Sequence, residues 1–137
     1  IINDQELRLL TGISNIIKAM PEVLKMGPKK VIVKKGEHGA MFFSAHETYV
    51  LPAFPTERVI DPTGAGDTFA GGFIGYLART KDISFENMKT AIIVGSAMAS
   101  FCVEKFGTQR LREINKADID TRLTDFVQLV NFDITLA

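Results

Sequence analysis

The residues best suited to do chemistry stand in one short run, residues 61–67, which read DPTGAGD. An apolar pattern at helical spacing follows, in which Phe69, Phe73 and Leu77 recur. Small residues at the start of a helix leave backbone N–H groups uncovered, and the helix dipole adds partial positive charge there. The run therefore predicts an anion-binding site. Asp67 beside it could take a proton from a hydroxyl group while the amides hold the charge that develops on a transferred group.

Three other glycine loops do not fit this run. The dinucleotide pattern GxGxxG fails because Phe69 stands where the third glycine would follow Gly64 and Gly66. The P-loop pattern fails because the chain contains no Gly-Lys-Ser/Thr, and the serine elbow fails because it contains no Gly-x-Ser-x-Gly. The remaining structural alternative is a tight glycine turn before a helix that has Asp67 as its N-cap.

The run resembles the second signature of the PfkB (ribokinase-like) carbohydrate kinases, whose pattern is Asp-Thr/Pro-x-Gly-Ala-Gly-Asp-x-Phe. The resemblance implies a three-layer α/β/α fold of the ribokinase type. It also implies ATP-dependent phosphorylation of a hydroxymethyl group on a sugar, or else of a nucleoside. In this family the final aspartate is the catalytic base, which is Asp67 here, and the amides of Gly64, Ala65 and Gly66 form the anion hole.

A strand and turn at residues 33–40 resemble the family's strand-Gly-x-x-Gly-Ala segment, which approaches the nucleotide. The resemblance implies that Gly36 and Gly39 let the backbone come close to a phosphate or a ribose. Lys34 and Lys35 alternate across the strand, so that only one of them can face the ligand, and the family register favours Lys34. The alternative for the two glycines is a plain hairpin turn.

The late helix and glycine turn of the family resemble residues 95–108. The resemblance implies that adenine lies against small helix residues such as Ser96. It further implies that the turn at Gly107 helps to bind a monovalent cation (K⁺), together with Asp61 and Thr63 of the Asp-x-Thr element. Close packing between helices through small side chains is the alternative explanation for the helix.

Asn3 and Glu6 resemble the family's Asn-x-x-Glu element, which is associated with Mg²⁺ held through water molecules. Carboxylate and amide oxygens suit this metal. The same spacing is also the signature of a helix capping box, in which the two side chains bond to backbone N–H groups at the start of a helix. Both roles can hold at once.

Composition excludes several classes of protein. Sixteen basic and sixteen acidic residues cancel, so charge gives no reason to expect a nucleic acid or a membrane as partner. The longest uncharged helical stretch, residues 91–103, is shorter than the roughly 20 residues of a membrane span. The single cysteine, Cys102, excludes an internal disulfide and fits a reducing, cytoplasmic compartment. His38 and His46 lack cysteine partners, so a histidine metal site is not expected.

Apolar periodicity and turn residues predict one α/β unit whose sheet is parallel at least in part. The mixed charges between Arg110 and Arg122 are expected to form a solvated face. The expected helices are 3–10 (ended by Gly12), 14–20 (ended before Pro21), 65–79, 85–105 and 117–130. The expected strands are 31–35, 40–44, 48–51 and 57–60.

The resemblance covers nearly all of the chain but only the C-terminal, nucleotide-binding side of the family. We therefore expect residues 1–137 to be the C-terminal part of a PfkB-type kinase domain. The family's N-terminal half carries most sugar-binding residues, so this part by itself is expected to be inactive and to self-associate as a homo-oligomer. Two alternatives are a nucleotide-binding fragment without catalysis and a regulatory protein that reuses the fold.

Overall fold

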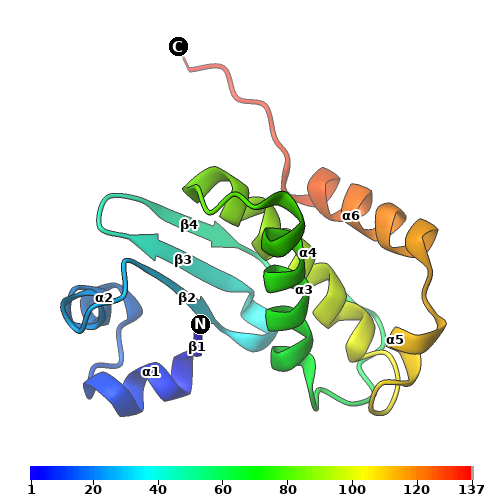
Figure 1. The fold of residues 1–137 in the computed structure, drawn as a ribbon, viewed down its shortest axis with the longest axis horizontal. Coiled ribbons are helices and arrows are strands. Elements are labelled where there is room, and N and C mark those ends of the chain that lie inside the picture. The colour runs from blue at the N-terminus through cyan, green and yellow to red at the C-terminus, as the bar shows by residue number, and fades with distance from the viewer. Residues whose placement is uncertain (137) are drawn as a thin grey trace. The chain divides into compact units, whose positions relative to one another are not determined.

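The computed structural model describes residues 1–136, which form two compact units (Figure 1). The first unit is Ile1–Ala53, and the second begins at Phe54. The first unit holds the whole sheet, and the second holds the two long helices. No helix among the described residues is long and apolar enough to cross a membrane.

The sheet of the first unit has four strands in the order β1-β2-β3-β4. β1 (Ile2–Asn3) runs parallel to β2 (Lys30–Lys34), whereas β3 (Ala40–Ser44) and β4 (Thr48–Leu51) continue the sheet in antiparallel fashion. The expectation of a partly parallel sheet is therefore confirmed. The short 3₁₀ turn η1 (Gly36–His38) connects β2 to β3.

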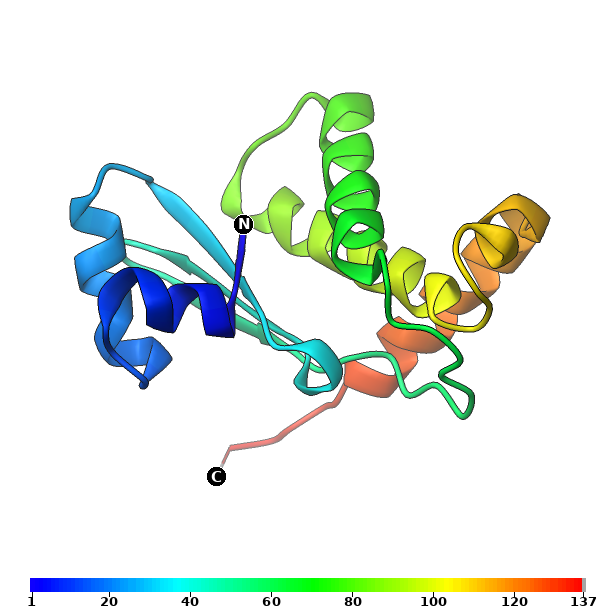
Figure 2. The same cartoon turned by 90° about the horizontal axis from the view of Figure 1, so that it is seen from below.

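Two helices, α1 (Asp4–Thr11) and α2 (Ile16–Lys25), cover one face of this sheet (Figure 2). Alternate strand residues point toward them, because side chains of a strand alternate between its faces. Gly12 ends α1 in a left-handed conformation with φ 69°, as its position predicted. The buried cluster consists of Leu7, Ala19, Met20, Val23, Val31, Val33 and Phe43.

The expected end of the second helix before Pro21 is wrong, because α2 continues through Pro21 to Lys25. Proline inside a helix loses one backbone hydrogen bond and costs about 3 kcal/mol. Met20 and Val23 on either side of it are buried in the core. Burying two such side chains contributes roughly 1.5–3 kcal/mol each, which offsets the cost of the proline. Packing has therefore overridden a local breaker.

The second unit is helical, with α3 (Ala65–Thr80), α4 (Phe85–Cys102), α5 (Gln109–Glu113) and α6 (Lys116–Val130). α3 and α4 pack closely because both carry glycine at the crossing. A Cβ added to Gly95 would lie 2.7 Å from the carbonyl oxygen of Phe69, and one added to Gly72 would lie 3.1 Å from the Cα of Gly95. Phe69 and Phe73 are buried and their rings stack at 6.4 Å.

Two expectations for this unit are corrected by the structure. Residues 57–60 form no strand; the N–H of Ile60 donates instead to the carbonyl of Val103 at 2.7 Å. Val59 and Ile60 are exposed, so the β-branched residues that suggested a strand are not core residues. The short helix α5 lies inside the expected solvated face and was not predicted.

Candidate functional site

The Asp61–Asp67 loop turns sharply into α3 at Gly64, whose φ is 80°. Gly64 is the N-cap of the helix, and its carbonyl accepts hydrogen bonds from the N–H of Thr68 at 2.9 Å and from the Thr68 hydroxyl at 2.8 Å. Asp67 therefore lies within the first turn, and the structural alternative that made it the N-cap is wrong. A left-handed backbone suits glycine, because it has no Cβ to clash.

Three backbone amides at this turn donate to no group among residues 1–136: those of Gly64, Gly66 and Asp67. The N–H of Ala65 differs, since it donates to the carbonyl of Pro62 at 3.1 Å. Free N–H groups at a helix N-terminus, with the positive end of the helix dipole behind them, bind anions. Asp67 is exposed beside them, and its side chain forms no hydrogen bond or ion pair with any described residue.

The C-terminal end of α4 contacts this loop. The carbonyl of Val103 accepts from the N–H groups of Ile60 at 2.7 Å and Asp61 at 3.2 Å. The Sγ of Cys102 lies 3.7 Å from the carbonyl oxygen of Thr63. Cys102 is only 2% exposed and is therefore a buried thiol. The loop is thus held at Ile60 and Asp61 and again at Thr63.

Asp61 and Thr63 meet within the loop, where the carboxylate accepts from the N–H of Thr63 at 3.0 Å. Hydrogen bonds from the backbone and the hydroxyl of Thr63 lower the pKa of Asp61, and the backbone N–H of Gly107 adds to the effect. Gly107 has φ 55° at the turn after α4. The structure therefore brings together the three residues for which the family resemblance implied a monovalent cation.

Asn3, Glu6 and Lys34 lie together in the first unit, since Asn3 of β1 is paired in register with Lys34 of β2. Asn3 and Glu6 form the capping box: the Asn3 Oδ1 accepts from the N–H of Glu6 at 2.8 Å, and the Glu6 Oε2 accepts from the N–H of Asn3 at 2.9 Å. The second carboxylate oxygen of Glu6 bonds to no group among residues 1–136 and is free for a water molecule.

The two glycines of the β2–β3 connection have positive φ, 56° at Gly36 and 85° at Gly39. A Cβ on Gly39 would lie 2.0 Å from the carbonyl oxygen of Leu51, whereas one on Gly36 would meet nothing within 4 Å. Glycine at position 39 is therefore required by the neighbouring backbone. Only Gly36 leaves open space for a ligand.

The family model described as pfkB family carbohydrate kinase matches residues 1–115. This chain belongs to the pfkB family. It is 32% identical over 123 residues to a ribokinase of Staphylococcus aureus, a match that covers 83% of this chain and 39% of the relative. It is also 35% identical over 83 residues to a cytidine kinase of Thermococcus kodakarensis, covering 59% of this chain and 30% of the relative.

A solved structure of the same family confirms the ribokinase-like α/β fold. It is a protein of E. coli described as ribokinase II, crystallised with ATP and Mg²⁺, with a TM-score of 0.73 and 30% identity over 90% of this chain and 38% of that one. The chain spans between 20% and 39% of the length of the curated relatives that it matches, which are therefore longer. ATP and Mg²⁺ are thus ligands of that E. coli protein.

Ser96, for which the family resemblance implied a contact with adenine, is half-buried on α4. Its neighbour Gly95 packs against Phe69, so the helix-packing explanation is confirmed for that glycine. Two hollows of the second unit lie elsewhere: one of about 530 Å³ is lined by Phe106, Thr108 and Arg112, among others, and one of about 390 Å³ by Phe54, Arg58 and Arg122, among others. Neither hollow is lined by the Asp61–Asp67 loop.

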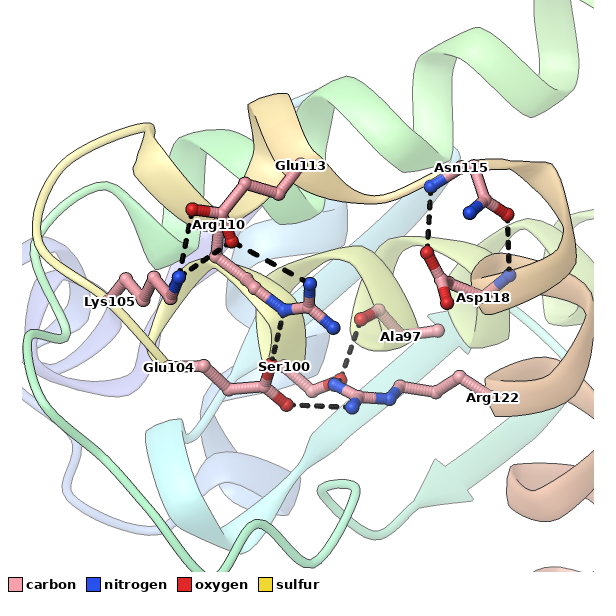
Figure 3. A network of polar contacts seen from close by, with 9 residues as sticks. All are labelled: Ala97, Ser100, Glu104, Lys105, Arg110, Glu113, Asn115, Asp118 and Arg122. Atoms are coloured by element: carbon pink, nitrogen blue, oxygen red, sulfur yellow. Dashed lines mark hydrogen bonds and ion pairs between the residues drawn. The ribbon is translucent and has the colours of Figure 1, made fainter.

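Sequence reasoning missed one cluster, the ion pairs around Glu104 (Figure 3). Its arginines, Arg110 and Arg122, are 26% and 17% exposed and therefore are not the solvated face that was expected. No short-range pattern could have found them, because Glu104 and Arg122 are 18 positions apart. Among residues 1–136, no three His, Cys, Asp or Glu side chains gather where they could hold a metal ion directly.

Proposed function

We propose that this chain supplies the phosphoryl-transfer side of an ATP-dependent kinase that phosphorylates a hydroxymethyl group of a sugar. The observation that carries the proposal is the start of α3, where three amides that donate to none of the described residues lie beside an exposed aspartate. Phosphoryl transfer needs positioning and charge stabilisation more than covalent participation of the protein. A helix N-terminus with an adjacent carboxylate provides both.

In this proposal Asp67 accepts the proton of the substrate hydroxyl while the oxygen of that hydroxyl forms a bond to the γ-phosphorus of ATP. The bond from that phosphorus to the bridging oxygen breaks, and ADP leaves with the electron pair. The amides of Gly64 and Gly66 hold the oxygens of the transferring group, and that of Asp67 adds a third donor. The expectation that the amide of Ala65 belongs to the anion hole is corrected, because this N–H already donates to the carbonyl of Pro62; Ala65 helps to fix the turn instead.

Mg²⁺ and a monovalent cation such as K⁺ fit the oxygen-rich groups of the chain. Asn3 and Glu6 would hold Mg²⁺ through water molecules, which suits a metal that keeps much of its hydration shell. Asp61 and Thr63, with the turn at Gly107, would hold the monovalent cation, and the lowered pKa of Asp61 keeps that carboxylate charged. When bound, the ions offset the charge of the phosphates.

We further propose nucleotide-contacting residues within each unit taken by itself: Lys34, Gly36 and Gly39 in the first, and Ser96 and Gly107 in the second. Lys34 would supply positive charge to a phosphate from the end of β2. The space around Gly36 is open, which supports its assignment to nucleotide binding. Gly39 contributes differently, because it permits the tight turn beside the backbone of Leu51. Ser96 is half-buried on α4, and a base could rest against the small residues around it.

A nucleoside is the second candidate substrate, and the cytidine kinase among the relatives favours it. A third candidate function is nucleotide binding without catalysis by these 137 residues taken alone. We propose that residues 1–137 are the C-terminal part of a PfkB-type kinase domain, which works in the cytoplasm with ATP and a sugar or nucleoside as partners. Nothing in its balanced charge favours a nucleic acid or a membrane surface.

The test uses the complete protein as its gene encodes it, in a coupled assay of ADP release over a panel of sugars and nucleosides. Asp67→Asn keeps the shape of the side chain but removes the proton acceptor. We expect turnover to fall by a factor of about 100 or more, the scale of general-base catalysis, with little change in ATP affinity.

The matched control is Asp125→Asn, because Asp125 is an exposed acid of α6 whose side chain forms no hydrogen bond or ion pair with any residue of the described part. It should leave turnover unchanged. Near-normal turnover of Asp67→Asn would contradict the assignment of the base. Release of ADP with nucleosides but with no sugar would decide for the second substrate class.

A further inference from the structure

The ion-pair cluster behind the loop is centred on Glu104, two residues after the end of α4 (Figure 3). Its Oε2 accepts from the Nε of Arg110 at 2.9 Å, and its Oε1 pairs with the Nη2 of Arg122 at 2.7 Å. The side chain of Glu104 is 20% exposed. Both of its carboxylate oxygens are therefore held, each by a different helix of the second unit.

The arginines are themselves fixed by packing and by further hydrogen bonds. The Arg122 guanidinium lies 3.6 Å from the ring centroid of Phe101, and its Nη1 donates to the Oγ of Ser100 at 3.0 Å. Ser100 in turn donates to the carbonyl of Ala97 at 2.6 Å. A guanidinium stacked on an aromatic face and bonded in this way has few other orientations open to it.

The position of Glu104 is electrostatically unfavourable in isolation. A helix C-terminus carries partial negative charge, so an acidic side chain just beyond α4 destabilises it, whereas the two arginines are favourable there. The carboxylate does not stabilise the helix end directly. Its structural role is to join α5 and α6 to the turn that follows α4, through its ion pairs with Arg110 and Arg122.

The turn after α4 is hydrogen-bonded to the Asp61–Asp67 loop. Val103, the residue before Glu104, provides the carbonyl that accepts from the N–H groups of Ile60 and Asp61. Asp61 then accepts from Thr63, and Cys102 contacts the carbonyl of Thr63. A continuous set of contacts therefore runs from Arg122 through Glu104 and the backbone of Val103 to the start of α3.

We propose that Glu104 is a positioning residue for the Asp61–Asp67 loop, which it holds in place through Arg110 and Arg122. The catalytic consequence rests on the proposed function, since it assumes that the loop binds the phosphates of ATP. The structural consequence does not, because the anchoring of Ile60 and Asp61 is independent of any ligand.

The experiment compares Glu104→Gln with Glu113→Gln in the complete protein. Glu113 is a matched control because it pairs with Lys105 and Arg110 in the same cluster but does not contact Arg122. Amide exchange at Ile60 and Asp61 should become about threefold to tenfold faster in Glu104→Gln, the factor expected when one or two backbone hydrogen bonds weaken. Glu113→Gln should leave both amides within twofold of the unaltered protein.

The kinetic measurement is the KM for MgATP against the KM for the sugar. We expect Glu104→Gln to raise the first about threefold to tenfold and to leave the second unchanged, with Glu113→Gln altering neither. Arg122→Gln should reproduce the effect, and the double variant with Glu104→Gln should add little to it. If Glu104→Gln fails to fold, Glu104→Asp serves, because it retains the charge but is too short to reach both arginines.

Unchanged exchange at Ile60 and Asp61 in Glu104→Gln, or an equal increase in Glu113→Gln, would overturn the positioning role. The two proposals can fail separately. An unaltered protein that releases no ADP with any sugar or nucleoside overturns the proposed function, while faster exchange confined to the Glu104 variants still supports the role of this residue in holding the loop.

Discussion

Gly64, rather than Gly66, is the residue of the loop whose backbone a side chain would strain. Gly64 has φ 80° as the N-cap of α3, whereas Gly66 lies within the helix and is not among the glycines with positive φ. The sequence run could predict the turn and the helix after it, because both depend on local residue types. It could not say which glycine turns the chain, since Gly64 and Gly66 are equally capable of it.

The two glycines give a pair of variants with opposite effects on stability. Gly64→Ala should lower the free energy of unfolding by about 1–2 kcal/mol, the cost of a left-handed conformation with a Cβ. Gly66→Ala should raise it by up to about 1 kcal/mol, because alanine is the better helix former. Urea unfolding measures both. A loss of stability in Gly66→Ala would contradict the helical placement of that residue.

Calorimetric titration with ATP separates the anion-site role of these glycines from a purely structural turn. If the amide of Gly66 approaches a phosphate, Gly66→Ala weakens ATP binding although it stabilises the fold. Binding that follows stability in both variants would favour the structural turn.

Asp61 gives a prediction about acid stability. Hydrogen bonds from Thr63 lower the pKa of this carboxyl in the folded protein below its unfolded value of about 3.9. The contribution to stability is therefore complete above the unfolded pKa and is lost as pH falls through the folded pKa. Asp61→Asn should be less stable than the unaltered protein at pH 5–7, and the difference should shrink as pH falls below about 4.

Thermal unfolding between pH 2.5 and 7 measures this effect for Asp61→Asn and for the control Asp125→Asn. A difference in melting temperature that stays constant across the range would show that ionisation of Asp61 does not contribute. Both variants remove one carboxylate, so a general effect of net charge would appear in the control as well.

At the level of elements, the sequence predicts those that are fixed by local signals. The strands at 40–44 and 48–51 have the expected bounds, and the helices at Ala65 and Phe85 begin where their patterns do. The failures have tertiary causes: α2 passes through Pro21 because its apolar face is buried, and the N–H of Ile60 donates to the carbonyl of Val103 instead of to a strand. Local propensity cannot register either interaction.

The packing of α3 on α4 gives a second matched pair of variants. Gly95→Ala would place a Cβ 2.7 Å from the carbonyl oxygen of Phe69, so the helices must separate. We expect a loss of about 1–3 kcal/mol, the usual cost of overpacking. Gly75→Ala on α3 meets nothing within 4 Å and should instead stabilise by up to about 1 kcal/mol.

Chemical denaturation provides the measurement for this pair. Equal effects of the two substitutions would show that helix propensity, and not the close approach of α3 to α4, decides the outcome. Because α3 begins at the Asp61–Asp67 loop, Gly95→Ala should also weaken ATP binding in the complete protein, while Gly75→Ala should not.

At the level of the whole molecule, each unit holds its own group of candidate site residues. Asn3, Glu6 and Lys34 gather in the first, and Asp61, Thr63 and Asp67 in the second. The family resemblance could name the residues of each group because each group is local in sequence or joined by one strand pair. The Glu104 cluster escaped it, since its members come from three places in the chain and share no periodic pattern.

The 137 residues taken alone should self-associate and should not phosphorylate sugars. β4 is an edge strand of the sheet, and an edge pairs readily with another chain. Large apolar side chains are exposed as well, with Leu9 at 87%, Phe132 at 77% and Leu136 at 82%. We expect sedimentation of the isolated chain to show species larger than a monomer, and the ADP-release assay to show no sugar-dependent activity. The complete protein should show that activity, since the relatives that this chain matches are longer. A monomer of 137 residues with sugar-dependent ADP release would contradict the prediction.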